Sequence, residues 1–281
     1  MASVSLILEG GGMRGAFTAG VLDCWLQKGI LIKTVYGVSA GACQACSYLS
    51  GQKGRGIRVW INHLNDKRFR SWQSLLRTGD LFNADFNYRQ IPFEIDPIDE
   101  EAYLRNGCEF HAVVTDLATG QAEYPLVRSF RQDMRLIQAT ASLPLISRPV
   151  EINGKLYLDG GVADSIPLAR SLADGHQKHV IVLTQAEGYQ KRPNRAMPLI
   201  KLRYRAYPRF VQAVADRHIL YNQTLRLIAR EQAAGRAFVI RPAVPPDIGR
   251  IEKDPEKMRA LYRAGYETAE GQLDALNAFL G

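Results

Sequence analysis

A serine flanked by small residues is the first position in this sequence that suggests covalent chemistry. Residues 37–41 read Gly-Val-Ser-Ala-Gly, which is the G-x-S-x-G pattern of a nucleophile elbow. The residues before it, 34–36, are strand-like, and residues 42–49 after it are small helix formers. A serine on such a sharp turn lies at a helix N-terminus, where backbone N–H groups favour negative charge. The pattern therefore predicts Ser39 as a nucleophile.

A run of glycines near the start of the chain suggests an anion site. Residues 10–15 read Gly-Gly-Gly-Met-Arg-Gly and directly follow a strand-like apolar run at residues 4–9. Consecutive glycines let backbone N–H groups converge without obstruction by side chains, as an oxyanion hole for a tetrahedral acyl intermediate requires. We expect this hole to be formed by Gly10, Gly11 and Gly12. Arg14 either fixes this loop, contacts an anionic substrate head or is an ordinary surface arginine.

The same glycines also fit a competing pattern. Gly10, Gly12 and Gly15 match the G-x-G-x-x-G fingerprint of dinucleotide-binding proteins. That fingerprint expects an acidic residue at the end of the second strand to bind a ribose, whereas the second strand here ends at Ser39. The sequence therefore favours the oxyanion hole, and a nucleotide-binding protein stays as an alternative.

A carboxylate follows another strand-like run, at residues 151–158. Asp159 precedes Gly160 and Gly161, and an Asp-Gly pair is in most proteins simply a turn. A carboxylate beside glycines can also approach a serine hydroxyl and accept its proton, the general-base role that histidine has in a catalytic triad. Asp159 is therefore a candidate base for Ser39.

In order and in spacing, the three motifs resemble those of the patatin-like phospholipases. Residues 115–120 and 139–144 are similar to connecting segments of that family, and the resemblance covers roughly residues 5–185. It implies a Ser39–Asp159 dyad without histidine, hydrolysis of lipid or phospholipid acyl esters without a metal or cofactor, and a three-layer α/β/α fold. The supporting loop residues are then Met13, Arg14, Gly15, Gly37, Gly41, Gly160 and Gly161.

Other chemistry must be weighed against this dyad. An esterase with a Ser-His-Asp triad is possible by residue order alone, since five histidines follow Ser39, none of them in a distinctive motif: His63, His111, His176, His179 and His218. Cys43 and Cys46 form a C-x-x-C within a predicted apolar helix, where we expect buried structural thiols. No cluster has metal-ligand spacing, so no metal is predicted. In a non-catalytic lipid-binding protein, Ser39 and Asp159 would be turn residues only.

The elements that position these motifs form a predicted α/β core with an extension. Strand-like and helical runs alternate up to residue 185, and two successive strand-turn-helix units predict a mainly parallel sheet between helical layers. We expect a catalytic core at residues 1–185, with helices and loops at 51–107 over the sheet. A basic linker followed by helices at 209–234 and 255–280 is expected within a mostly helical extension at 186–281.

Composition and charge narrow the class of partner. The 281 residues are 46% hydrophobic and 23% charged, as in globular proteins, and carry a formal net charge of +8. Residues 191–217 hold eight basic residues and one acidic residue, a local charge of 8 − 1 = +7, with aromatic residues interleaved. This stretch suits peripheral contact with an anionic membrane, and a solvated face is the plainer interpretation. No nucleic-acid-binding module accompanies the charges, so no nucleic-acid partner is expected.

Cysteine usage and hydropathy bear on localisation. Four cysteines in so long a chain, together with an N-terminus unlike a signal peptide, favour a cytoplasmic protein. No apolar run approaches the roughly 18 residues that a membrane-spanning helix needs, so any membrane contact is expected to be peripheral. None of these patterns predicts an oligomeric state.

Overall fold

The structure, a computed structural model, describes residues 3–249 and 251–281. Its strands are β1 Val4–Leu8, β2 Thr34–Val38, β3 Glu109–Asp116, β4 Ala122–Glu123, β5 Val150–Ile152, β6 Lys155–Asp159, β7 Lys178–Val182 and β8 Ala237–Ile240. They form one sheet of eight strands in the order β5-β6-β3-β2-β1-β7-β8, with β4 paired to β3. The four neighbour pairs from β3 to β8 are parallel, and the three pairs that involve β4, β5 or β6 are antiparallel.

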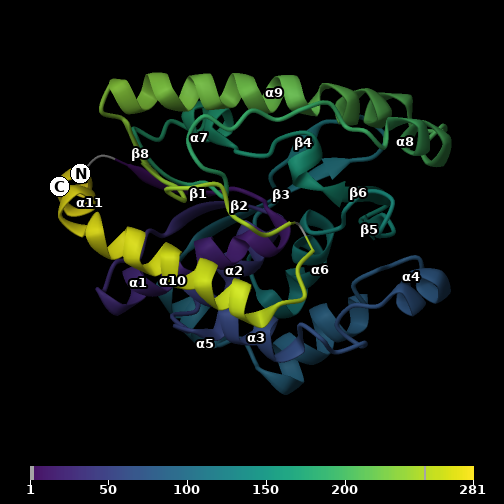
Figure 1. Cartoon of the computed structure of the whole chain (residues 1–281), viewed down its shortest axis with the longest axis horizontal. Helices are drawn as coiled ribbons and strands as arrows, with labels where there is room; N and C mark the ends of the chain where they lie inside the picture. Colours follow the sequence, from purple (N-terminus) through teal and green to yellow (C-terminus); the bar gives the residue numbers. More distant parts are fainter. Residues whose placement is uncertain (1–2, 250) are drawn as a thin grey trace.

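Helices cover both faces of this sheet (Figure 1). They are α1 Gly15–Gln27, α2 Ala40–Leu49, α3 Arg55–His63, α4 Trp72–Thr78, α5 Glu100–Asn106, α6 Phe130–Thr140, α7 Leu168–Ala173, α8 Met197–Arg203, α9 Pro208–Ala233, α10 Pro255–Gly271 and α11 Leu273–Leu280. Two short 3-10 turns, η1 Gly12–Arg14 and η3 Gly160–Val162, and a π-helix, η2 Phe86–Ile95, complete the set. In Figure 1, α7 and α9 lie above the sheet, and α1, α2, α6 and α10 lie below it. The predicted α/β/α sandwich with a mainly parallel sheet is confirmed.

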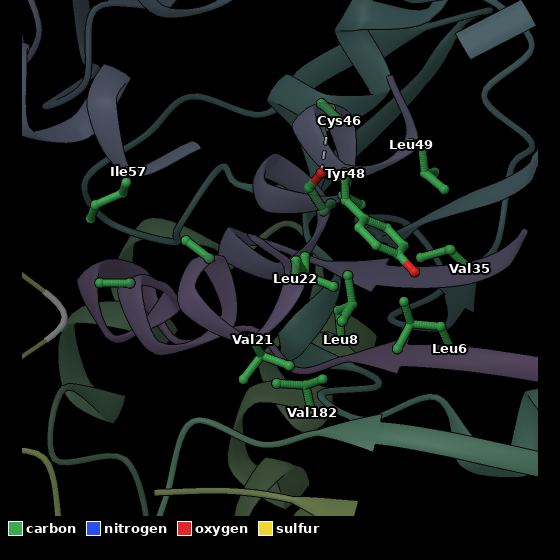
Figure 2. Packing of buried hydrophobic residues seen from close by; sticks show 14 of the residues in the cluster. Leu6, Leu8, Val21, Leu22, Val35, Cys46, Tyr48, Leu49, Ile57 and Val182 are labelled. Carbon is green, nitrogen blue, oxygen red and sulfur yellow. Dashed lines mark hydrogen bonds between the residues drawn. The ribbon is translucent and has the colours of Figure 1, made fainter. Parts of the chain in front are cut away.

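Alternating side chains of the central strands make two separate cores. Leu6 and Leu8 of β1 point to the core shared with α1 and α2, where Figure 2 shows them beside Leu22 and Tyr48. Ile7, between them, packs in the other core with residues of α7 and α9. Because successive side chains of a strand point to opposite faces, an apolar strand such as β1 is stable only when both faces are covered. This explains why its sequence is a continuous apolar run.

The C-terminal third is built into the same sandwich. Strand β8 extends the sheet by pairing in parallel with β7, and α10 packs along α1 with Met258 and Leu261 buried. The side chain of Asp254 accepts hydrogen bonds from the N–H groups of Glu256 and Lys257, as an N-cap before Pro255 should. No helix among the described residues is long and apolar enough to cross a membrane.

Within the basic linker predicted after residue 185, the structure has one helix that was not predicted. Residues 197–203 form α8, which begins with a proline in its first turn and is anchored by the fully buried Ile200. Ile200 packs with Tyr204 and Phe210 in a small cluster of its own. Basic residues interrupt the apolar residues of this segment, so its helical pattern was not evident from the sequence.

Candidate active site

Strand register brings Ser39 and Asp159 to the same place. Val38 of β2 is paired with Val113 of β3, and the next residue of β3, Val114, is paired with Asp159 of β6. Ser39 and Asp159 therefore face each other across β3. The Ser39 hydroxyl donates a hydrogen bond of 2.7 Å to Oδ2 of Asp159. Ser39 is 7% exposed and Asp159 is 2% exposed, so this bond forms where water has little access.

The backbone of Ser39 has an elbow conformation. Its φ of 53° and ψ of −122° lie outside the ordinary regions for a residue with a side chain. Two contacts hold it: its N–H donates to Oγ1 of Thr140 at 2.9 Å, and its carbonyl accepts from Cys43 N–H as α2 begins. Gly41 allows α2 to approach β1, because a Cβ there would lie 2.5 Å from the carbonyl oxygen of Leu8.

The carboxylate of Asp159 is fixed by its neighbours. Its Oδ1 accepts the N–H of Gly161 at 2.7 Å, which leaves Oδ2 directed at Ser39. The Asp159 N–H donates to the carbonyl of Ser142, and its carbonyl accepts from Oγ1 of Thr115. A group held in this way can accept a proton from Ser39 without first having to be oriented.

The glycine loop lies against Ser39. A Cβ on Gly10 would approach Cβ of Ser39 to 2.9 Å, so only glycine fits at this point. Gly12 and Met13 line the same cavity as Ser39. The N–H groups of Gly10, Gly11 and Gly12 donate to no acceptor among residues 3–249 and 251–281. They are therefore available to a ligand oxygen at the elbow.

The remaining predicted loop residues surround this centre. Met13 and Arg14 form η1 with Gly12, and Gly15 is the first residue of α1. Gly37 lies in β2, Gly41 lies in α2, and Gly160 and Gly161 begin η3. Arg14 is half-buried, and its positive charge is near enough to Tyr221 to act on the pKa of that phenol. The structure thus brings together the three motifs that are far apart in the sequence.

A buried glutamate, Glu9, directly precedes the Gly10–Gly12 loop and was not predicted to have a role there. Glu9 is 2% exposed; its Oε2 accepts from the N–H and hydroxyl of Thr184, and its Oε1 accepts from the hydroxyl of Tyr221 at 2.6 Å. Burial, and then the charge of Glu9, raise the pKa of Tyr221 far above its ordinary value. These bonds connect the start of the loop to the segment after β7 and to α9. The only signal in the sequence was a charged residue at the end of an apolar strand.

An apolar cavity of about 140 Å³ opens beside Ser39. Much of its lining is apolar and comes from the 51–107 segment and the region around α6: Val59, Trp60, Phe69, Phe82, Ile91, Met134, Ile137 and Leu143. Such a lining suits the hydrocarbon part of an acyl ester, because apolar surface is removed from water when a chain enters.

The two cysteines of the C-x-x-C lie on α2 in this wall. Both are free thiols, and burial raises the pKa of Cys43 to about 12 and that of Cys46 further. Since a thiol with so high a pKa stays protonated at neutral pH, the two groups pack as small apolar side chains.

The five histidines have their contacts elsewhere. His179 is fully buried between the hydroxyls of Ser5 and Ser171, and burial lowers its pKa to about 4. His63 contacts Asp66, and His111 contacts Glu109 and Tyr124. His176 contacts Tyr36, and His218 contacts the carbonyl of Ala215. The hydroxyl of Ser39 donates to a carboxylate instead. Within the described residues, no group of three or more His, Cys, Asp or Glu side chains is placed to hold a metal ion.

The chain is similar in sequence to several known proteins. A family model described as patatin-like phospholipase matches residues 6–171, and one described as a domain of unknown function matches residues 207–281. An Escherichia coli protein, YjjU, described as uncharacterized, is 28% identical over 190 residues, which are 64% of this chain and 52% of that protein. Lysophospholipase nte1 of Emericella nidulans is 27% identical over 182 residues, 59% of this chain and 11% of its own length.

The chain thus spans about half of the first relative and about a tenth of the second. Among solved structures, VipD from Legionella pneumophila has a similar fold, with a TM-score of 0.50 at 12% sequence identity. The match covers 98% of this chain and 67% of that one.

Proposed function

The chain belongs to the patatin-like phospholipase family, and we propose that it hydrolyses acyl esters of lipids with Ser39 as nucleophile and Asp159 as general base. The observation that carries this proposal is the 2.7 Å hydrogen bond from the Ser39 hydroxyl to Asp159, at the edge of an apolar cavity. The cavity supplies a place for the acyl chain, and the carboxylate supplies a base that needs no histidine.

The reaction follows from the positions of these groups. Asp159 accepts the hydroxyl proton as Oγ of Ser39 attacks the ester carbonyl, and the N–H groups of the Gly10–Gly12 loop stabilise the oxyanion that forms. The protonated Asp159 then donates to the departing alcohol, which leaves an acyl ester on Ser39. In the second half, Asp159 takes a proton from water, the hydroxide attacks the acyl group, and Ser39 is released with its proton restored.

We propose a phospholipid or lysophospholipid as the substrate. The relatives named lysophospholipase and the family model both support a glycerophospholipid ester over other carboxylic esters. Hydrolysis of a total lipid extract, followed by mass spectrometry, tests this directly. We expect free fatty acid and lysophospholipid or glycerophosphodiester to accumulate with the wild-type protein and not with Ser39→Ala. Accumulation with both proteins would reject Ser39 as the nucleophile.

Residues 191–217 are proposed to make peripheral contact with the inner, cytoplasmic face of an anionic membrane. Leu199 and Leu202 of α8 are 59% and 66% exposed and alternate with the basic Lys201 and Arg203. A cavity of about 830 Å³ between segment 188–195 and α9 adds further cations, namely Lys191, Arg192, Arg195 and Arg217. Exposed apolar side chains beside cations are what an anionic lipid surface binds.

A further inference from the structure

The apolar cavity beside Ser39 has a polar end. Gln44 and Ser47 of α2 and Arg55 of α3 line it together with the apolar side chains. These three polar residues are only 2%, 3% and 5% exposed. Long or charged polar side chains are seldom buried so deeply unless hydrogen bonds satisfy them.

Several donors of these three residues lack an acceptor among the described residues. Arg55 donates through Nε and Nη2 to the carbonyl of Asp96 and through Nη1 to Oγ of Ser47. A guanidinium has five N–H groups, so two remain without an acceptor among the described residues. Among the residues that the structure describes, the amide of Gln44 makes no hydrogen bond, and the Ser47 hydroxyl finds no acceptor. The polar end of the cavity is thus rich in donors.

The charge of Arg55 is already offset. Its Nε lies 3.5 Å from Oδ1 of Asp96, whose carboxylate also accepts two hydrogen bonds from Arg58. The unused donors of these cavity-lining residues therefore suit a neutral oxygen, such as a hydroxyl group, and do not require an anion.

The spacing along α2 sets how far this end lies from the reacting ester. Gln44 and Ser47 follow Ser39 by five and eight residues, and an α-helix rises 1.5 Å per residue. The two side chains therefore lie about 7.5 Å and about 12 Å beyond the nucleophile along the helix axis. A chain of moderate length that starts at the ester carbonyl can reach them.

We propose that Gln44, Ser47 and Arg55 form a subsite that selects acyl chains carrying a hydroxyl group away from the ester. The proposal rests on the function proposed above, because it takes the cavity to be the acyl-chain site. An unsubstituted alkyl chain that fills the cavity strips water from these donors and leaves them unsatisfied. A hydroxylated chain accepts from them, and its own O–H can donate to the oxygen of Gln44.

Gln44→Met tests the subsite with little change in volume. The matched control is Gln132→Leu, which removes an amide from an exposed position of α6 outside the cavity. We would measure kcat/KM for p-nitrophenyl esters of ω-hydroxy acids and of unsubstituted acids over a series of equal chain lengths. We expect the wild type and Gln132→Leu to prefer the hydroxylated ester by about tenfold at the best length, and Gln44→Met to lose that preference.

A binding measurement makes the test independent of turnover. In the Ser39→Ala background, calorimetry compares the free ω-hydroxy acid with the unsubstituted acid, with and without Gln44→Met. The expected result is tighter binding of the hydroxy acid, by about tenfold, only where Gln44 is present. Equal binding of the two acids by both proteins, or a preference that survives Gln44→Met, would overturn the subsite.

The two readouts also separate this proposal from the function on which it rests. Failure of the wild type to hydrolyse any ester in the series would count against the proposed function, while the calorimetry would still decide the subsite. Thermal unfolding of Gln44→Met is a further check. Because the amide makes no hydrogen bond to a described residue, the midpoint should not fall, and a clear drop would show that Gln44 is structural.

Discussion

Thr140 and Ser39 are 101 residues apart in the chain, yet Oγ1 of Thr140 accepts the backbone N–H of Ser39 at 2.9 Å. Thr140 is the last residue of α6 and is fully buried. The N–H that its hydroxyl accepts is that of Ser39 itself, whose φ is positive.

This contact predicts a selective effect of Thr140→Val. The substitution preserves shape but leaves a buried N–H without an acceptor, which costs about 1–3 kcal/mol. Because the strain falls on the proposed nucleophile, we expect kcat to drop by about tenfold or more, with a loss of stability no larger than this cost. Thr140→Ser keeps the acceptor and serves as the control. Equal kcat values for the valine variant and the wild type would show that the bond does not position Ser39.

Close packing at the elbow predicts that Gly41→Ala is poorly tolerated. The added methyl group would lie 2.5 Å from the carbonyl oxygen of Leu8, so α2 must move away from β1. We expect a loss of about 1–3 kcal/mol or more in the free energy of unfolding, measured by urea denaturation. Gly271→Ala is the matched control, since a methyl there meets no atom within 4 Å and should stabilise α10 by up to about 1 kcal/mol. Similar stabilities of the two variants would contradict the packing argument.

The stability of the fold should depend on the titration of Asp164. Burial raises the pKa of Asp164 to about 6, although hydrogen bonds from the hydroxyl of Tyr124 and the N–H of Ile166 lower it. The folded-state pKa thus lies above the ordinary value of 3.8. The native protein then holds a proton that the unfolded chain releases, so this contribution to stability is complete below pH 3.8 and disappears as the pH rises through 6.

Asp164→Asn removes this titration. The free energy of unfolding of Asp164→Asn, minus that of the wild type, should rise by up to about 3 kcal/mol between pH 4 and pH 7.5. Chemical denaturation at a series of pH values measures the difference, and the pH dependence common to both proteins cancels. A difference that is flat over this interval would show that Asp164 titrates normally.

The basic α8 helix predicts salt-dependent membrane binding. Sedimentation with vesicles that contain phosphatidylglycerol should capture the protein, and raised salt should weaken capture because it screens the exposed charges. The triple variant Lys201→Gln, Arg203→Gln and Arg205→Gln is expected to lose most of this binding while it still hydrolyses a soluble ester. Capture that is equal on uncharged vesicles, or insensitive to salt, would rule out this contact.

The local motifs were accessible from the sequence because each lies in a few consecutive residues. Ser39 after a strand, the glycine run after β1 and Asp159 at the end of β6 were all placed correctly along the chain, since turn chemistry depends on neighbours. The contacts that join the motifs are different in kind. The contact between Ser39 and Thr140 joins residues 101 positions apart, and the contact between Glu9 and Tyr221 joins residues 212 positions apart. No rule based on sequence spacing predicts contacts over such separations.

The cavity beside Ser39 shows the same division between what was predicted and what was not. Its walls come from a segment without clear periodicity, where η2 adopts a π-helix that contains Pro92. Whether a residue such as Phe82 faces the cavity or solvent depends on tertiary packing, and sequence patterning could predict only that helices and loops cover the sheet.

The most direct test of the dyad is the hydrolysis of p-nitrophenyl butyrate by four proteins: the wild type, Ser39→Ala, Asp159→Asn and Asp164→Asn. The first two substitutions should each lower kcat/KM by at least about a thousandfold while thermal unfolding stays near that of the wild type. Asp164→Asn makes the same change outside the dyad and should remain active. Undiminished hydrolysis by folded Ser39→Ala or Asp159→Asn would contradict the Ser39–Asp159 mechanism.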